Sequence, residues 1–233
     1  MVPSGMKATI AAAALAAALA PSPSPAETIL VPAGDGASLQ DTLDAARPGD
    51  VVRLAAGEHR GPVTIAATLT LEGEPGAAIV ADGRGSVVTV AAEDAVVRGL
   101  EIKGSGRDIG ALDSGVFLAR SARRARVEDN AILGNLYGVY VQGAEAAEVR
   151  GNRIVGIGEG RTAEAGNGVH VWNAPGAKVI GNEISRGRDG IFANASRDNV
   201  FSGNRFSDLR FAVHYMYTND SEISGNVSTG NKI

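Results

Sequence analysis

Apolar and polar residues alternate in very short runs along most of the chain, and these runs recur at a fixed interval. A Gly-Asn phrase followed by apolar residues occurs four times, and a variant precedes them. The asparagines of the five phrases are 22, 30, 22 and 22 residues apart, at Asn130, Asn152, Asn182, Asn204 and Asn226. A second phrase, Gly with apolar residues at alternate positions after it, keeps nearly the same step at Gly115, Gly138, Gly168 and Gly190.

Repeats of about 22 residues, each with several short alternating strands, predict an all-β fold, a right-handed parallel β-helix. Each coil should add one rung of about 4.8 Å to the stack, with Val, Ile and Leu inside. The recurrent Asn suits a tight corner, because it tolerates left-handed backbone and can form a ladder with the Asn of neighbouring coils. Residues 104–114 and 156–166 are expected to be loops outside the coils.

The two ends of the predicted β-helix differ. Residues 37–47 are expected to form a short amphipathic helix, with Ser38 as its N-cap and Leu39 and Leu43 on one side. Such a helix would cover the open N-terminal end, which otherwise exposes unpaired backbone. Residues 230–233 contain no comparable closing element. Either this end pairs with a partner or a second chain, or the sequence is a fragment of a longer protein; we expect a fragment that lacks the C-terminal part.

Residues 1–26 have the pattern of a secretory signal peptide. Lys7 precedes thirteen residues, 8–20, that are all Ala, Leu, Thr or Ile, and small residues precede a cleavage site after Ala26. The apolar run is shorter than the roughly 20 residues that a membrane span needs. The expected mature part, residues 27–233, is the β-helix domain.

Composition narrows the function classes. The formal net charge is -4, so a general nucleic-acid-binding surface is not expected. The chain contains no Cys, which excludes disulfides, thiolate metal sites and cysteine nucleophiles.

The third position of the second phrase should point outward, and rings occupy it in successive coils, at Phe117, Tyr140, His170, Phe192 and His214. Met216 follows His214 by two residues and should face the same way. Imidazole and thioether form a soft, neutral ligand set that suits copper, particularly Cu(I). His170, His214 and Met216 are therefore candidate copper ligands. The two histidines are two coils apart, roughly 10 Å, so they are not expected to share an ion without help from loops.

A carbohydrate-active interpretation uses other residues, since β-helices often carry polysaccharide lyases, hydrolases and epimerases that work through carboxylates, Lys, Arg or His. Candidates for such a site are Asp113, Arg186, Arg188, Asp189 and His214. There is also a basic group of four arginines: Arg120, Arg123, Arg124 and Arg126. It would suit an acidic polymer, although a solvated corner explains it more simply.

The runs 187–192, 204–206 and 211–217 resemble NosD, a family of exported right-handed parallel β-helices of the CASH type that belongs to the copper-maturation system of nitrous oxide reductase. The resemblance extends over essentially the whole mature part and is sharpest in residues 181–226. It implies a periplasmic accessory protein without catalytic activity. Its implied partners are an ABC-type ATPase and permease, a lipoprotein copper chaperone and the reductase itself. The resemblance assigns no residue role, so the three ligand candidates rest on side-chain chemistry.

Overall fold

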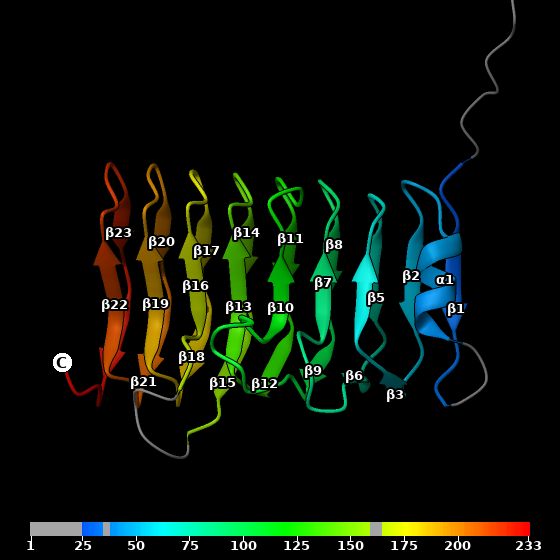
Figure 1. Cartoon of the computed structure of the whole chain (residues 1–233), viewed down its shortest axis with the longest axis horizontal. Helices are drawn as coiled ribbons and strands as arrows, with labels where there is room; N and C mark the ends of the chain where they lie inside the picture. Colours follow the sequence, from blue (N-terminus) through cyan, green and yellow to red (C-terminus); the bar gives the residue numbers. More distant parts are fainter. Residues whose placement is uncertain (1–24, 35–37, 159–164) are drawn as a thin grey trace, which may run out of the picture.

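The computed structural model describes residues 25–34, 38–158 and 165–233. The chain winds into a right-handed parallel β-helix whose coils stack along one long axis (Figure 1). In the described residues it has 24 short strands, all paired in parallel, and one short helix. This confirms the fold predicted from the repeat. The predicted signal peptide lies almost entirely outside the described residues.

Each complete coil contributes a strand to each of three sheets, named here in the order in which the chain visits them, and the coils at the two ends contribute fewer. The first sheet contains β1 Thr28–Val31, β2 Val51–Leu54, β5 Thr70–Gly73, β8 Val96–Arg98, β11 Arg126–Glu128, β14 Glu148–Arg150, β17 Lys178–Ile180, β20 Val200–Ser202 and β23 Glu222–Ser224. The second contains β3 Gly57–Arg60, β6 Ala77–Val80, β9 Glu101–Lys103, β12 Ala131–Asn135, β15 Arg153–Gly156, β18 Glu183–Ser185, β21 Arg205–Ser207 and β24 Val227–Thr229. The third contains β4 Val63–Ile65, β7 Val88–Val90, β10 Ser114–Leu118, β13 Tyr137–Gln142, β16 Val169–Trp172, β19 Asp189–Asn194 and β22 Phe211–Met216.

The core runs along the inside of the coils. Alternate side chains of every strand point inward, so that in β16 Val169 and Val171 are fully buried while His170 and Trp172 are partly exposed. The repeated glycines of the second phrase permit close stacking: a Cβ on Gly168 would lie 2.2 Å from Ile184 and 2.8 Å from the carbonyl oxygen of Gly190 in the next coil. Gly is therefore required at this step wherever another coil stacks on it, whereas Ala212 occupies the same step in the last coil.

The repeated asparagines form the predicted ladder at the corner between the first and second sheets. From Asn130 to Asn204, each side-chain amide donates to the side-chain oxygen of the next Asn in the row at 2.9–3.0 Å. That oxygen also accepts the backbone N–H of the preceding Asn. Left-handed backbone at the corner is supplied by the residue before the Asn, as in Gly181 with φ +65°. The corner Asn itself is not left-handed, so the ladder bonds, and not its tolerance of this conformation, explain why Asn recurs.

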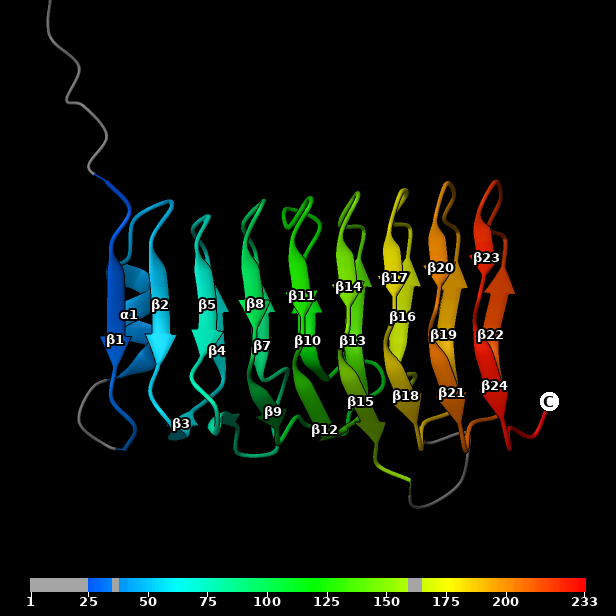
Figure 2. The same ribbon diagram turned by 180° about the vertical axis from the view of Figure 1, so that it is seen from behind.

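A helix covers the N-terminal end, as predicted, although it is shorter than the expected 37–47. Helix α1 (Leu39–Ala45) begins after Ser38, whose hydroxyl accepts the N–H of Asp41, and it buries Leu39 and Leu43. Figure 2 shows it beside β1 and β2 at the blue end of the stack. The side chain of Gln40 accepts from the backbone N–H of Thr64 and donates to its carbonyl, at 2.7 and 3.0 Å. These bonds satisfy the outermost strand of the third sheet much as another strand would.

The opposite end is open. Ile223 and Val227 in the last coil are about half exposed, whereas Phe201 and Phe206 one coil earlier are buried. The expectation that this chain is a fragment stays a prediction.

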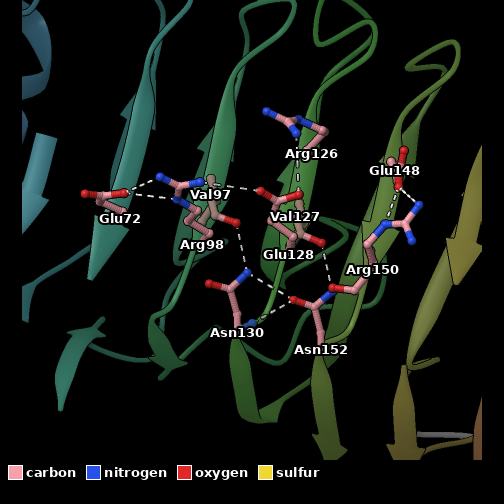
Figure 3. A network of polar contacts seen from close by, with 10 residues as sticks. All are labelled: Glu72, Val97, Arg98, Arg126, Val127, Glu128, Asn130, Glu148, Arg150 and Asn152. Carbon is pink, nitrogen blue, oxygen red and sulfur yellow. Dashed lines mark hydrogen bonds and ion pairs between the residues drawn. The ribbon is translucent and has the colours of Figure 1, made fainter. Parts of the chain in front are cut away.

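Charged side chains on the outer face of the first sheet pair with one another. Arg53, Glu72, Arg98, Glu128 and Arg150 occupy one row of the register, so positive and negative residues alternate along the stack. Glu72 accepts from Arg53 at 2.7 Å and from Arg98 at 2.6 Å. Figure 3 shows how this row continues beside the Asn ladder. The outer face of the first sheet is therefore largely self-neutralised.

None of the helices in the described ranges is long and apolar enough to cross a membrane.

Candidate metal-binding ridge on the third sheet

The predicted ridge of rings lies on the outer face of the third sheet. Phe117, Tyr140, His170, Phe192 and His214 occupy one row of the register. Successive ring centroids are 5.8, 4.3, 4.7 and 4.7 Å apart. The parallel register creates this stack, because a residue type repeated at the coil period is placed directly above its copy.

One part of the ridge is covered. Tyr137 and Tyr140 are buried, and Leu112 and Ile157 from the two predicted loop excursions pack against them. Burial raises the pKa of Tyr140 to about 12 and also raises the pKa of Tyr137. Both phenols therefore stay protonated at neutral pH and serve as packing for the ridge.

His170 lies at the boundary between the covered and the open part. Burial, with a smaller contribution from Arg188, lowers the pKa of its ring to about 4 although Asp189 opposes the change. The side-chain nitrogen of Asn167 lies 3.2 Å from Nδ1. With this nitrogen donating to Nδ1, the proton of the neutral ring is on Nε2, and neither nitrogen has a free lone pair. His170 in this arrangement is a ring of the stack, and it would have to change tautomer to bind a metal.

His214 is held differently, in the open part of the ridge. Its Nδ1 lies 3.0 Å from Oδ2 of Asp189, a fully buried carboxylate. In the tautomer whose Nδ1 donates to this carboxylate, the lone pair of Nε2 is free. A terminal nitrogen of Arg210, which only donates, lies 3.1 Å from the same Nδ1, so Nδ1 can bond only one of the two in either tautomer. A carboxylate behind a histidine in this way fixes the tautomer and raises the basicity of the metal-binding nitrogen.

Met216 is the second candidate ligand in the open part of the ridge. It follows His214 on β22, two residues along and on the same face, so the two Cα atoms are about 6.6 Å apart. Phe192 lies between His170 and His214 and contacts both rings, which keeps the two histidines from one ion. Among the described residues no three His, Cys, Asp or Glu side chains gather as a metal site. The arrangement therefore fits a soft ion of low coordination number on His214 Nε2 and Met216 Sδ.

Sequence reasoning missed Arg210. Its Nε donates to Oδ1 of Asp189 at 2.8 Å and one terminal nitrogen donates to Oδ2 at 2.6 Å. The coil period places Arg210 directly after Arg188 in the stack, so the alignment of repeats gives its position. Its bidentate bond to Asp189 depends on a side-chain conformation that no spacing specifies.

The residues of the carbohydrate-active interpretation are only partly brought together. Asp189 and His214 are in contact, but Asp189 is buried against Arg210. Asp113 lies three coils away and accepts the backbone N–H of Asp108, which stabilises the loop before β10. The structure therefore shows no pair of accessible carboxylates among the residues named for that site.

The basic group is largely neutralised by acidic neighbours. Arg124 pairs with Asp94 at 2.7 Å and with Glu93 at 3.0 Å. Arg123 pairs with Glu145, and Arg126 lies 3.7 Å from Glu128. A solvated corner, the simpler of the two interpretations, agrees with these pairs.

A known protein family matches the part of the chain that contains the open part of the ridge. Residues 155–232 match the family model of NosD, described as a periplasmic copper-binding protein. The matched coils are similar to those of this family. They contain His170, His214 and Met216 as well as the Asp189–Arg210 pair.

Two curated relatives agree with this match. The chain is 39% identical over 138 residues to a "Probable ABC transporter binding protein NosD" of Stutzerimonas stutzeri, and 34% identical over 137 residues to a protein of the same name from Pseudomonas aeruginosa. Each alignment covers 59% of this chain and 32% of the relative. The matched region thus spans about a third of the length of these relatives.

Solved structures share the fold alone. A pectate lyase superposes with a TM-score of 0.58 at 14% identity, covering 88% of this chain and 62% of its own. The catalytic unit of an α-1,3-glucanase from Streptomyces thermodiastaticus gives a TM-score of 0.56 at 20% identity, covering 80% and 41%. At these identities the likeness extends to the β-helix and not to the activity.

Proposed function

We propose that this chain is a periplasmic copper-handling protein without catalytic activity, which helps to mature the copper sites of nitrous oxide reductase. The observation that carries the proposal is that the family match and the candidate ligands lie in the same coils. The coils that match the NosD family model are those in which the tautomer of His214 that donates to Asp189 leaves Nε2 free on the same strand face as Met216.

In this proposal copper is cargo, held briefly by His214 and Met216. Two neutral, soft ligands favour Cu(I) and bind it weakly enough to let it pass on. His170 is kept as a candidate for a second position along the ridge, reached when its ring changes tautomer. The ridge itself is a rigid, preformed surface, so a partner that docks on it loses little ordering entropy.

The proposed partners are an ABC-type ATPase and permease, a lipoprotein copper chaperone that donates the metal, and the reductase that receives it. The names of the two relatives support the first of these. The ATP would be hydrolysed by the transporter, since the chain's own described ridge offers only ligands and rings.

The second candidate function is binding or modification of an anionic polysaccharide. The fold it shares with polysaccharide-active enzymes is the observation in its favour. Against it stands Asp189, whose two oxygens are engaged by Arg210 and His214 and are not accessible as a base.

The binding step is tested with the purified chain and Cu(I) under anaerobic conditions, in competition with a chromophoric Cu(I) chelator. We expect one Cu(I) per chain, with affinity at least tenfold lower in His214→Ala and in Met216→Leu. Asn194→Ala is the matched control, because Asn194 pairs with Met216 in the register and its side chain forms no hydrogen bond among the described contacts. Unchanged affinity in both ligand variants would refute the site.

The maturation step is tested in a denitrifying cell that lacks its own version of the protein. Copper per purified nitrous oxide reductase should rise when the chain is expressed, and should not rise with the double variant His214→Ala/Met216→Leu. A full-length relative serves as the positive control. Turnover of an alginate-like or pectin-like polymer by the purified chain would favour the polysaccharide function instead.

A further inference from the structure

Arg210 is fixed on several sides beside the proposed ligands. It forms a bidentate bond to Asp189, and the same terminal nitrogen lies 3.1 Å from Nδ1 of His214. Its guanidinium carbon is 4.8 Å from the centre of the Phe211 ring. The Arg210 side chain is 24% exposed and that of Asp189 is fully buried. The guanidinium is thus held in one place, close to where an ion on His214 would lie.

The consequence is a matter of charge. Asp189 carries one negative charge and Arg210 one positive charge, while a neutral His214 and Met216 carry none, so these four residues sum to zero. Without Arg210, the buried carboxylate behind His214 would give the site a net negative charge. A divalent ion gains twice as much from that charge as a monovalent ion does.

We infer that Arg210 determines the metal specificity of this site, by cancelling the charge of Asp189 so that monovalent Cu(I) is preferred over Zn²⁺ and other divalent ions. The inference rests on the proposed function, because it takes His214 and Met216 as the ligands. Asp189 is still needed to fix the tautomer of His214. The pair therefore provides the orienting carboxylate without its attraction for divalent ions.

Arginine suits this role better than lysine would. A guanidinium binds both carboxylate oxygens in one plane and stacks on an aromatic ring, and both contacts are present here. The positive charge is what the inference requires, and the fork only holds it in place. Lysine at this position should therefore keep the specificity while weakening the fixation of Asp189.

The test measures two dissociation constants for each variant, for Cu(I) and for Zn²⁺, with a competing chelator specific for each ion. In Arg210→Gln we expect roughly tenfold tighter Cu(I) and roughly a hundredfold tighter Zn²⁺ binding, because the gain is squared for a divalent ion and solvent reduces both. The preference for Cu(I) over Zn²⁺ should fall about tenfold. Arg205→Gln, on the outer face of the second sheet, is the matched control and should leave both constants unchanged.

Two further variants separate charge from packing. Arg210→Lys should keep the parent's preference within about threefold, and Asp189→Asn/Arg210→Gln, which again sums to zero, should return to it. Circular dichroism and a thermal melt establish that each variant is folded, and the double variant and Arg210→Lys provide the test if Arg210→Gln is not.

The outcomes distinguish this inference from the proposed function. Equal changes for both ions in Arg210→Gln, or a Lys variant that behaves like Gln, would overturn the charge argument while the copper site stands. Undiminished Cu(I) binding in His214→Ala would show that the ligands are elsewhere, and the role of Arg210 would fall with them.

Discussion

Acid should destabilise the protein through His170, and replacing that one ring should remove much of the effect. The ring packs between Tyr140 and Phe192, with centroids at 4.3 and 4.7 Å. His170→Phe keeps a ring in the stack but has no proton to bind. The difference between parent and variant as a function of pH then reports the titration of this residue.

The size of this loss of stability follows from the pKa of His170, which burial lowers from 6.5 to about 4. Between these values the unfolded chain binds a proton at His170 that the folded chain does not. The contribution of His170 to the free energy of unfolding is therefore fully present above about pH 6.5. It is lost on acidification, with a limiting slope of about 1.4 kcal/mol per pH unit. By pH 4 the accumulated loss is about 3 kcal/mol, a large part of the 5–15 kcal/mol typical of folded domains.

Urea unfolding at intervals from pH 8 to pH 4 measures the free energy of unfolding of each protein. Between pH 6.5 and 4, we expect the parent's free energy of unfolding to fall more steeply with decreasing pH than the variant's. Phe also leaves the Asn167 amide without a partner, which adds a constant offset but does not change the slope. Tyr140→Phe is the matched control, because the Tyr140 ring stacks on His170 but does not titrate in this range. The stability curve of this control should parallel the parent's. Parallel curves for parent and His170→Phe would refute the reasoning.

Two other changes test the repeat itself, each read from urea unfolding. Asn182→Ala removes three kinds of ladder bond: those between Asn side chains, the one from the backbone N–H of Asn152, and the one to the carbonyl of Val149. It leaves buried donors and acceptors unpaired, so it should cost about 3–5 kcal/mol. Asn194→Ala should cost less than about 0.5 kcal/mol, and equal costs would contradict the ladder's role. Gly168→Ala places a methyl group 2.2 Å from Ile184 and should cost about 3 kcal/mol or more. Gly181→Ala meets nothing within 4 Å and has only its φ of +65° to strain, so about 1 kcal/mol is expected; the reverse order would contradict the packing argument.

Much of this fold follows from the sequence because each coil repeats the same local problem. Inward Val and Ile, the corner Asn and the close-packed Gly recur at one period, so the period alone gives the register that places His170, Phe192 and His214 in a row. The cap at the N-terminal end was likewise predictable, since Ser38 and two leucines specify a helix locally.

The environment of the candidate ligands could not be predicted in the same way. Asp189 and Arg210 are 21 residues apart, and the period aligns Asp189 with Phe211, one residue away from its actual partner. Whether Arg210 reaches across depends on rotamers and on the cation–π contact with Phe211. The sequence also left open which corner residue is left-handed, because Asn and Gly both suit such a position. The structure shows that the residue before the Asn is left-handed and that the Asn forms the ladder.

The three outer faces of the β-helix explain why chemistry is expected on the third. Inward positions are constrained by the core and the corners by the Asn ladder, so only outward positions are free to vary. On the first sheet, residues such as Glu72 and Arg98 satisfy each other. The third sheet instead carries rings and, at its open part, an imidazole whose Nδ1 lies 3.0 Å from Asp189. When Nδ1 donates to that carboxylate, the lone pair of Nε2 is available to an ion or to a partner that carries one.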